Sequence, residues 1–160
     1  MRITIYKAKI DNDYRNTILV REKSSNYTAL DNLDKPEKVV DLMNNVFSLN
    51  IMAEEYCFLI CVDSKNHPVG FFEISHGTIN SSLVSARSIY SRALLLGAAN
   101  ILLIHNHPSG CITPSTEDIQ ITEKLYNAGL LLDVQLLDHI IIAGSAYYSF
   151  KENNLIIQCF

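Results

Sequence analysis

The segment from His105 to Asp118 carries the residues best suited to chemistry in this chain. His105 and His107 are separated by one residue, and Ser115 and Asp118 follow after a short loop rich in proline and glycine. Two imidazoles and one carboxylate are typical of catalytic zinc, because they leave a fourth tetrahedral position for water. Zinc bound in this way lowers the pKa of that water to about 7. The pattern therefore indicates a zinc hydrolase centre.

The predicted elements around the histidines explain how these side chains could converge. Ile101–Ile104 is a short apolar run typical of a buried strand, and residues spaced i, i+2 along a strand project from the same side. His105 and His107 should therefore point the same way. Pro108 cannot continue the hydrogen bonding of a sheet, so the loop is expected to turn back and bring Ser115 and Asp118 within reach.

Ser115 and Asp118 also fit a simpler structural interpretation. They have the spacing of a capping box, with Ser115 as the N-cap of a helix and an acid at the third helical position, where the helix dipole favours negative charge. A His-x-His pair alone is weak evidence for a metal. Taken alone, Ser115 and Asp118 favour the helix cap. The joint pattern is much rarer than either half, and together with the family resemblance described next it favours the metal site, with the helix cap as the alternative.

The same residues resemble the motif of a known superfamily. His105, His107, Ser115 and Asp118 are similar to the His-x-His, Ser, Asp core of the JAMM (MPN-plus) metalloproteases, and the surrounding residues resemble the RadC family. The resemblance covers residues 36 to 155. The matching positions are Gly77–Ser82, Arg87, His105–Gly110, Thr113–Ser115, Asp118, Leu137–Ile141, and Ser149 with Phe150.

The resemblance implies a fold, a cofactor and an activity. The fold class is α/β, a JAMM/MPN (cytidine-deaminase-like) mixed β-sheet flanked by helices in a single domain. One zinc ion is implied at His105, His107 and Asp118, with Ser115 supporting an oxyanion and a glutamate from an earlier strand as the general base. The implied reaction is hydrolysis of an amide, peptide or isopeptide bond in an unknown protein or peptide substrate.

Three glutamates compete for the role of general base. Glu54 and Glu55 stand directly before the predicted strand Tyr56–Asp63, where superfamily members carry this acid. In RadC-like sequences it lies eight residues before the aspartate that ends the strand, which selects Glu55. Glu54 stays as an alternative, and Glu73, inside a later predicted strand, is expected on a solvent-facing side.

Three function classes follow from these residues. In the hydrolase, Glu55 takes a proton from the attacking water and returns it to the leaving amine, while Ser115 helps to stabilise charge on the carbonyl oxygen. The second class is a non-catalytic or regulatory RadC-like module in DNA repair or mobile-element maintenance. A nuclease is the third, weakened by the lack of an acidic two-metal cluster and of a basic groove in the sequence.

Two further features bear on the predicted site. His139 lies in an apolar predicted strand, where a core histidine is expected, although it or Asp138 could instead orient a ligand through a hydrogen bond. Cys111 stands where RadC-like loops usually carry an acidic or amide residue. Its thiolate could become a fourth zinc ligand, but an exposed loop thiol is the favoured interpretation.

Composition indicates a small globular protein. The chain has 160 residues, 48% of them hydrophobic, which suits one domain. A net charge of -4 without a lysine or arginine cluster argues against a large nucleic-acid footprint, while leaving a small one open. There is no membrane-length apolar run, no signal-peptide block and no Cys-x-x-Cys pair. We therefore expect a cytoplasmic protein with reduced thiols and no membrane partner.

The chain is predicted to divide into two parts. Residues 1–33 form a strand-rich extension outside the resemblance, where full-length RadC proteins carry a helical DNA-binding domain, and residues 34–160 form the RadC-like domain. The predicted elements are strands Ile3–Ile10 and Thr17–Arg21, a helix capped by Asp34 and Glu37, the strand pair Tyr56–Asp63 and Pro68–His76, a loop at Gly77 to Asn80, helices Ser85–Ala98 and Ser115–Ala128, the latter stopped by Gly129, and strands Val134–Ala143 and Ala146–Phe150.

Overall fold

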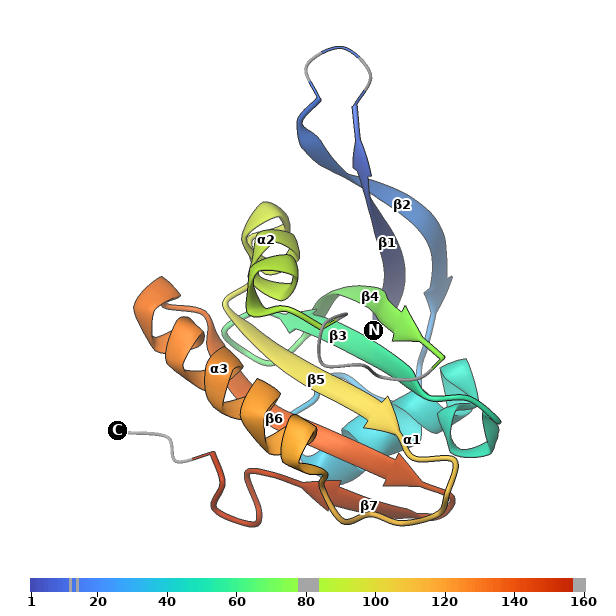
Figure 1. Cartoon of the computed structure of the whole chain (residues 1–160). Helices are drawn as coiled ribbons and strands as arrows, with labels where there is room; N and C mark the ends of the chain where they lie inside the picture. Colours follow the sequence, from blue (N-terminus) through green and yellow to red (C-terminus); the bar gives the residue numbers. More distant parts are fainter. Residues whose placement is uncertain (12, 14, 78–83, 157–160) are drawn as a thin grey trace.

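The chain forms one mixed sheet with helices on both faces (Figure 1). The computed structural model describes residues 1–11, 13, 15–77 and 84–156. The sheet has seven strands in the order β2-β1-β4-β3-β5-β6-β7. This arrangement confirms the predicted α/β fold class. Of the sequence features considered above, Thr78–Ser82, with the loop position Asn80, lie outside the described residues.

The elements have the following bounds. The strands are β1 (Arg2–Ile10), β2 (Thr17–Asn26), β3 (Tyr56–Val62), β4 (Pro68–His76), β5 (Asn100–Asn106), β6 (Gln135–Ala143) and β7 (Ala146–Ser149). The helices are α1 (Pro36–Phe47), α2 (Ala86–Leu96) and α3 (Thr116–Leu132), with a single 3-10 turn at Leu49–Ile51. Among the described residues, no helix is long and apolar enough to span a membrane.

The sheet topology brings distant segments together at the end of β5. Strand β3 lies in the middle of the sheet and pairs antiparallel with β5, so that Cys57 stands opposite His105. Strand β6 pairs parallel with β5 on its other side, with His139 beside Leu103. The start of β3, and with it Glu55, therefore lies next to the histidine end of β5.

Alternating residues of the central strands form two apolar clusters, one on each face of the sheet. The face toward α2 and α3 contains Leu59, Ile101, Leu103, Ile89 and Leu125. The face toward α1 contains Phe58, Ile60, Ile104, Leu42 and Met43. His105 follows the alternation of Ile101 and Leu103, so its side chain is directed toward α3 in a largely dry environment.

The predicted cap of α1 was wrong. Asp34 is not the N-cap, because Pro36 begins the helix and places the extended Lys35 at the capping position, without a side-chain hydrogen bond. Proline favours the first helical turn, where its missing N–H has no partner to lose. Asp34 instead forms an ion pair with Lys38 at 2.7 Å.

The predicted end of α3 was also wrong. The helix continues through Gly129 to Leu132 and ends at Asp133, whose backbone is left-handed with φ 54°. A Cβ at position 129 would lie 2.6 Å from both the Tyr90 hydroxyl and the Val134 carbonyl oxygen. The glycine therefore permits close packing of α3 and does not stop the helix.

The N-terminal strands join the sheet, and the second of them is longer than predicted. β2 continues to Asn26, beyond the predicted end at Arg21, and β1 pairs parallel with β4 at Ile5 and Phe71. Much of this hairpin projects from one edge of the sheet (Figure 1). It therefore extends the sheet on the side of β4, while the histidines lie on β5 and just beyond it.

Candidate metal centre

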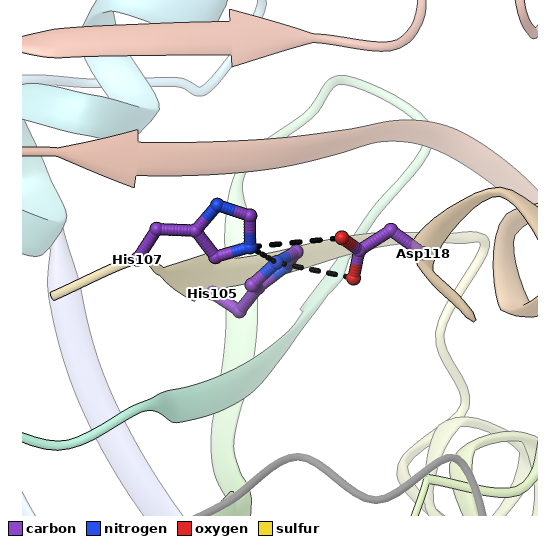
Figure 2. A group of neighbouring side chains, drawn as sticks. All are labelled: His105, His107 and Asp118. Atoms are coloured by element: carbon purple, nitrogen blue, oxygen red, sulfur yellow. Dashed lines mark hydrogen bonds and ion pairs between the residues drawn. The ribbon is translucent and has the colours of Figure 1, made fainter. Parts of the chain in front are cut away.

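The side chains of His105, His107 and Asp118 meet at one point (Figure 2). His105 lies near the end of β5, His107 follows that strand, and Asp118 lies in the first turn of α3. The Nε2 atoms of the two histidines are 3.0 Å apart. Asp118 Oδ1 lies 3.2 Å from His105 Nε2, and Asp118 Oδ2 lies 3.6 Å from His107 Nε2. Within the described ranges, this is the one cluster of three His, Cys, Asp or Glu side chains that could hold a metal ion.

The spacing of these ligand atoms suits a tetrahedral ion. Two ligand atoms about 2.1 Å from zinc and at the tetrahedral angle are about 3.4 Å apart. The three separations, 3.0, 3.2 and 3.6 Å, scatter around that value. The 3.2 Å distance is to Asp118 Oδ1 and the 3.6 Å distance is to Oδ2. The convergence predicted for His105 and His107 is confirmed, and the three side chains lie close enough together to hold one metal ion.

The helix cap and the ligand role of Asp118 are compatible. The Ser115 backbone N–H and hydroxyl donate to Asp118 Oδ2 at 2.8 and 2.7 Å, and the Asp118 N–H donates to the Ser115 hydroxyl at 3.1 Å. This is the capping box that formed the alternative interpretation. Because the cap binds Oδ2, it leaves Oδ1 toward His105 and orients the carboxylate for a metal.

Hydrogen bonds behind the imidazoles also position them. His107 Nδ1 lies 2.7 Å from the carbonyl oxygen of Cys111. A carbonyl only accepts, so Nδ1 carries the proton and, in the neutral ring, Nε2 has a free lone pair toward the centre. His105 Nδ1 lies 2.9 Å from His139 Nε2, which puts His139 in the orienting position that was the alternative to a core histidine.

Burial and neighbouring charges shift the pKa values of the three candidate ligands in different directions. His105 is 2% exposed, and burial lowers its pKa to about 4, so it is neutral at pH 7. Burial opposes the charge of Asp118, but His107, His105 and Ser115 together hold the pKa of that carboxyl well below its usual range. The neighbouring Asp118 carboxylate is the main reason that the pKa of His107 is raised, against the opposing effect of burial.

An open cavity of about 360 Å³ lies over the three side chains and includes Glu55. The negative charge of Glu55 also helps to raise the pKa of His107. The cavity is lined by Glu55, His105, His107, Ser109, Cys111, Thr113, Ser115, Glu117 and Asp118. Glu55 therefore lines the same cavity as the three candidate metal ligands.

The two competing glutamates lie elsewhere. Glu54 does not line the cavity. Its carboxylate lies 2.6 Å from His76 Nε2, and its side chain is 59% exposed. Glu73 is exposed on β4 and acts electrostatically on Lys7 of β1. The geometry therefore favours Glu55 as the acid next to the centre.

Asn106 is a positioning residue that the sequence analysis missed. Its Oδ1 accepts a hydrogen bond from the Tyr56 N–H at 2.8 Å, and its Nδ2 donates to the Glu54 carbonyl at 3.0 Å. These bonds hold the peptide groups on both sides of Glu55 against the end of β5. A buried amide between two candidate ligand histidines was the available signal.

Cys111 contributes its backbone to the centre. Its carbonyl accepts from His107, whereas its exposed thiol interacts with Thr113, which lowers the pKa of the thiol. The thiol is not part of the three-residue cluster. The structure therefore gives no support to the alternative that Cys111 is a fourth ligand.

The fold and the site define a JAB/MPN-type domain with a candidate metal centre. Residues 33–155 match the family model of the RadC-like JAB domain. The chain belongs to this family, as the resemblance in its sequence indicated.

Several curated relatives of this chain are UPF0758 proteins. The chain is similar to a UPF0758 protein of Pelobacter propionicus, 35% identical over 140 residues, which are 88% of this chain and 60% of the relative. It is 42% identical to a UPF0758 protein of Clostridium novyi over 108 residues, 68% of this chain and 47% of the relative. A UPF0758 protein of Clostridium perfringens is 40% identical over 124 residues, 78% and 54% of the two chains. The chain thus spans about half of these relatives' length.

Proposed function

We propose that this protein is a zinc-dependent hydrolase of the JAMM type that cleaves an amide, peptide or isopeptide bond. The observation that carries the proposal is the meeting of His105, His107 and Asp118 under one cavity that Glu55 also lines. Two imidazoles and one carboxylate, with an open side for water and substrate, are the ligand pattern of catalytic rather than structural zinc.

A zinc ion held by His105, His107 and Asp118 would supply Lewis acidity, which would acidify a bound water and polarise a carbonyl group. Glu55 acts as the general base: it takes a proton from the attacking water and delivers it to the leaving nitrogen. Asn106 keeps Glu55 in place through the two adjoining peptide groups. These roles need both a neutral His105 and an ionised Asp118, the states that burial and neighbouring charges favour.

Ser115 is proposed to stabilise the oxyanion. Its hydroxyl lines the cavity but donates to Asp118 Oδ2 in this structure. The hydroxyl can rotate toward a developing negative charge, since the Ser115 N–H continues to hold Asp118 at 2.8 Å.

The experiment compares Glu55→Gln with Glu54→Gln in the full chain loaded with zinc. Both proteins are incubated with a pool of peptides and lysine-linked isopeptides, and new amines are detected by mass spectrometry. Glu55→Gln should keep zinc and lose about a hundredfold or more in rate, the usual scale of general-base catalysis. Glu54→Gln should retain activity, because Glu54 faces His76.

Two results would overturn parts of this proposal. Loss of activity in Glu54→Gln with full activity in Glu55→Gln would move the general base by one residue. A zinc-loaded wild-type protein that cleaves no member of the pool would favour the alternative, a non-catalytic RadC-like module.

A further inference from the structure

Behind His105, a row of hydrogen bonds leads away from the metal centre into the core. His105 Nδ1 lies 2.9 Å from His139 Nε2, and His139 Nδ1 lies 2.7 Å from the Thr122 hydroxyl. That hydroxyl lies 2.6 Å from the backbone carbonyl of Asp118, one turn earlier in α3. The row therefore begins at one candidate ligand and returns to the backbone of another.

The chemistry of the last partner determines the direction of every proton in this row. The Asp118 carbonyl can only accept, so the Thr122 hydroxyl donates to it and must accept from His139 Nδ1–H. With its proton on Nδ1, a neutral His139 accepts at Nε2, and His105 must donate from Nδ1–H. His105 Nε2 is then left as a bare lone pair that faces His107 and Asp118.

Burial keeps the row neutral and closed to solvent. His139 is 1% exposed, His105 2% and Thr122 2%, and charged rings are disfavoured so far from water. His139 also stacks on Phe150, with ring centroids 4.7 Å apart and planes 13° apart, which prevents the ring from turning freely.

We propose that Thr122 and His139 are positioning residues that set the tautomer of His105 and thereby make its Nε2 atom available to the metal. This inference rests on the proposed function, because it gives the row a purpose in zinc binding. Without the acceptor at Thr122, His139 is free to carry its proton on Nε2 and donate to His105 Nδ1. His105 would then hold its own proton on Nε2, where it blocks the ligand position.

The matched variants are Thr122→Val and Thr122→Ser. Valine has nearly the shape of threonine but no hydroxyl, whereas serine keeps the hydroxyl and loses a methyl group. Zinc affinity, measured against a competing chelator, should fall ten- to a hundredfold in Thr122→Val, the scale seen when outer-shell partners of metal ligands are removed. Thr122→Ser should keep most of the wild-type affinity, because it keeps the hydroxyl and loses only a methyl group.

A second measurement reads the tautomer directly in metal-free protein. Nitrogen-15 NMR of histidine should assign the proton of His105 to Nδ1 in the wild type and Thr122→Ser, and show a population with the proton on Nε2 in Thr122→Val. A purely structural role would lower the stability of the variants without changing the tautomer. His139→Phe keeps the stacking on Phe150 and removes the acceptor, so it should weaken zinc binding as Thr122→Val does.

The outcomes separate the two proposals. Wild-type zinc affinity in Thr122→Val, or an unchanged His105 tautomer in that variant, would overturn the role of the hydrogen-bonded row. If the wild type binds no zinc, the proposed function fails, and a wild-type His105 with its proton on Nε2 would overturn the row independently.

Discussion

The two sides of the candidate metal centre are built differently. On the core side, His105 is 2% exposed and bonds to His139, another buried side chain. On the loop side, the His107 side chain is 13% exposed and bonds to the carbonyl of the exposed Cys111. The buried core side therefore fixes the position that a metal would take, while the loop side leaves space for substrate beside Glu55.

The largest expected effect comes from Asp118, which faces both histidines. Asp118→Asn removes the negative charge beside two imidazoles, so zinc affinity should fall by about two orders of magnitude or more, while the fold survives. The side-chain amide oxygen of the new asparagine can still accept from the Ser115 N–H and hydroxyl. The helix should therefore lose only about 0.3 to 1 kcal/mol of dipole stabilisation. Chelator competition and thermal unfolding measure the two effects. Unchanged zinc affinity would reduce Asp118 to a helix cap.

As the pH falls, His107 on the loop side should be protonated before His105, and zinc affinity should fall. The neighbouring Asp118 carboxylate raises the pKa of His107, whereas burial lowers the pKa of His105 to about 4. As the pH falls through the raised pKa of His107, one proton competes with the metal, and zinc affinity should fall about tenfold per pH unit. Titration of zinc between pH 8 and pH 5 tests this. A loss of zinc affinity of about a hundredfold per pH unit above pH 5 would mean that two protons compete with the metal, and that the two histidines do not differ in pKa.

Protonation of His107 weakens zinc binding but stabilises the metal-free fold. Because the folded pKa of His107 is raised, metal-free protein gains stability from its protonation at low pH and loses that gain as the pH rises through the raised value. Zinc should therefore stabilise the chain most at high pH. Thermal unfolding with and without zinc at several pH values measures this difference.

Ser115→Ala should have an intermediate effect. It removes the hydroxyl that donates to Asp118 Oδ2 and accepts from the Asp118 N–H, so the chain should lose about 1 kcal/mol of stability as an N-cap is lost. The Ser115 N–H still holds the carboxylate, and zinc should remain bound at saturating concentration. Turnover should fall if the hydroxyl stabilises the oxyanion. Ser115→Thr is the control that keeps the hydroxyl, and full turnover in Ser115→Ala would argue against this role.

The smallest effect is expected at Cys111. Its thiol is exposed and its contact with His107 uses the backbone carbonyl, so Cys111→Ser should change zinc affinity by less than about twofold. A tenfold loss in this variant would show that the thiol binds the metal and would remove the contrast between the two sides.

The candidate ligands could be predicted from the sequence because they are close in the chain. The apolar run before His105 predicts a buried strand, and strand alternation with a capping box brings His107 and Asp118 near it. These are local patterns with strong physical preferences. The mixed sheet flanked by helices also agrees with the fold class that the resemblance implied.

Other parts of the site depend on segments that are distant in the chain. Asn106 bonds to peptide groups fifty residues away, and the partner of His139 is Thr122 on a different element. Gly129 resembled a helix stop, but its neighbours Tyr90 and Val134 require a residue without a Cβ. Contacts of this kind depend on packing across the sheet, which residue spacing does not encode.

Zinc stoichiometry of the wild-type chain tests the central claim most directly. The purified protein, stripped of metal and then titrated with zinc against a competing chelator, should bind one zinc per chain, with loss of that site in His107→Ala. Binding of no zinc, or of one zinc with unchanged affinity in His107→Ala, would contradict the assignment of His105, His107 and Asp118 as the metal centre.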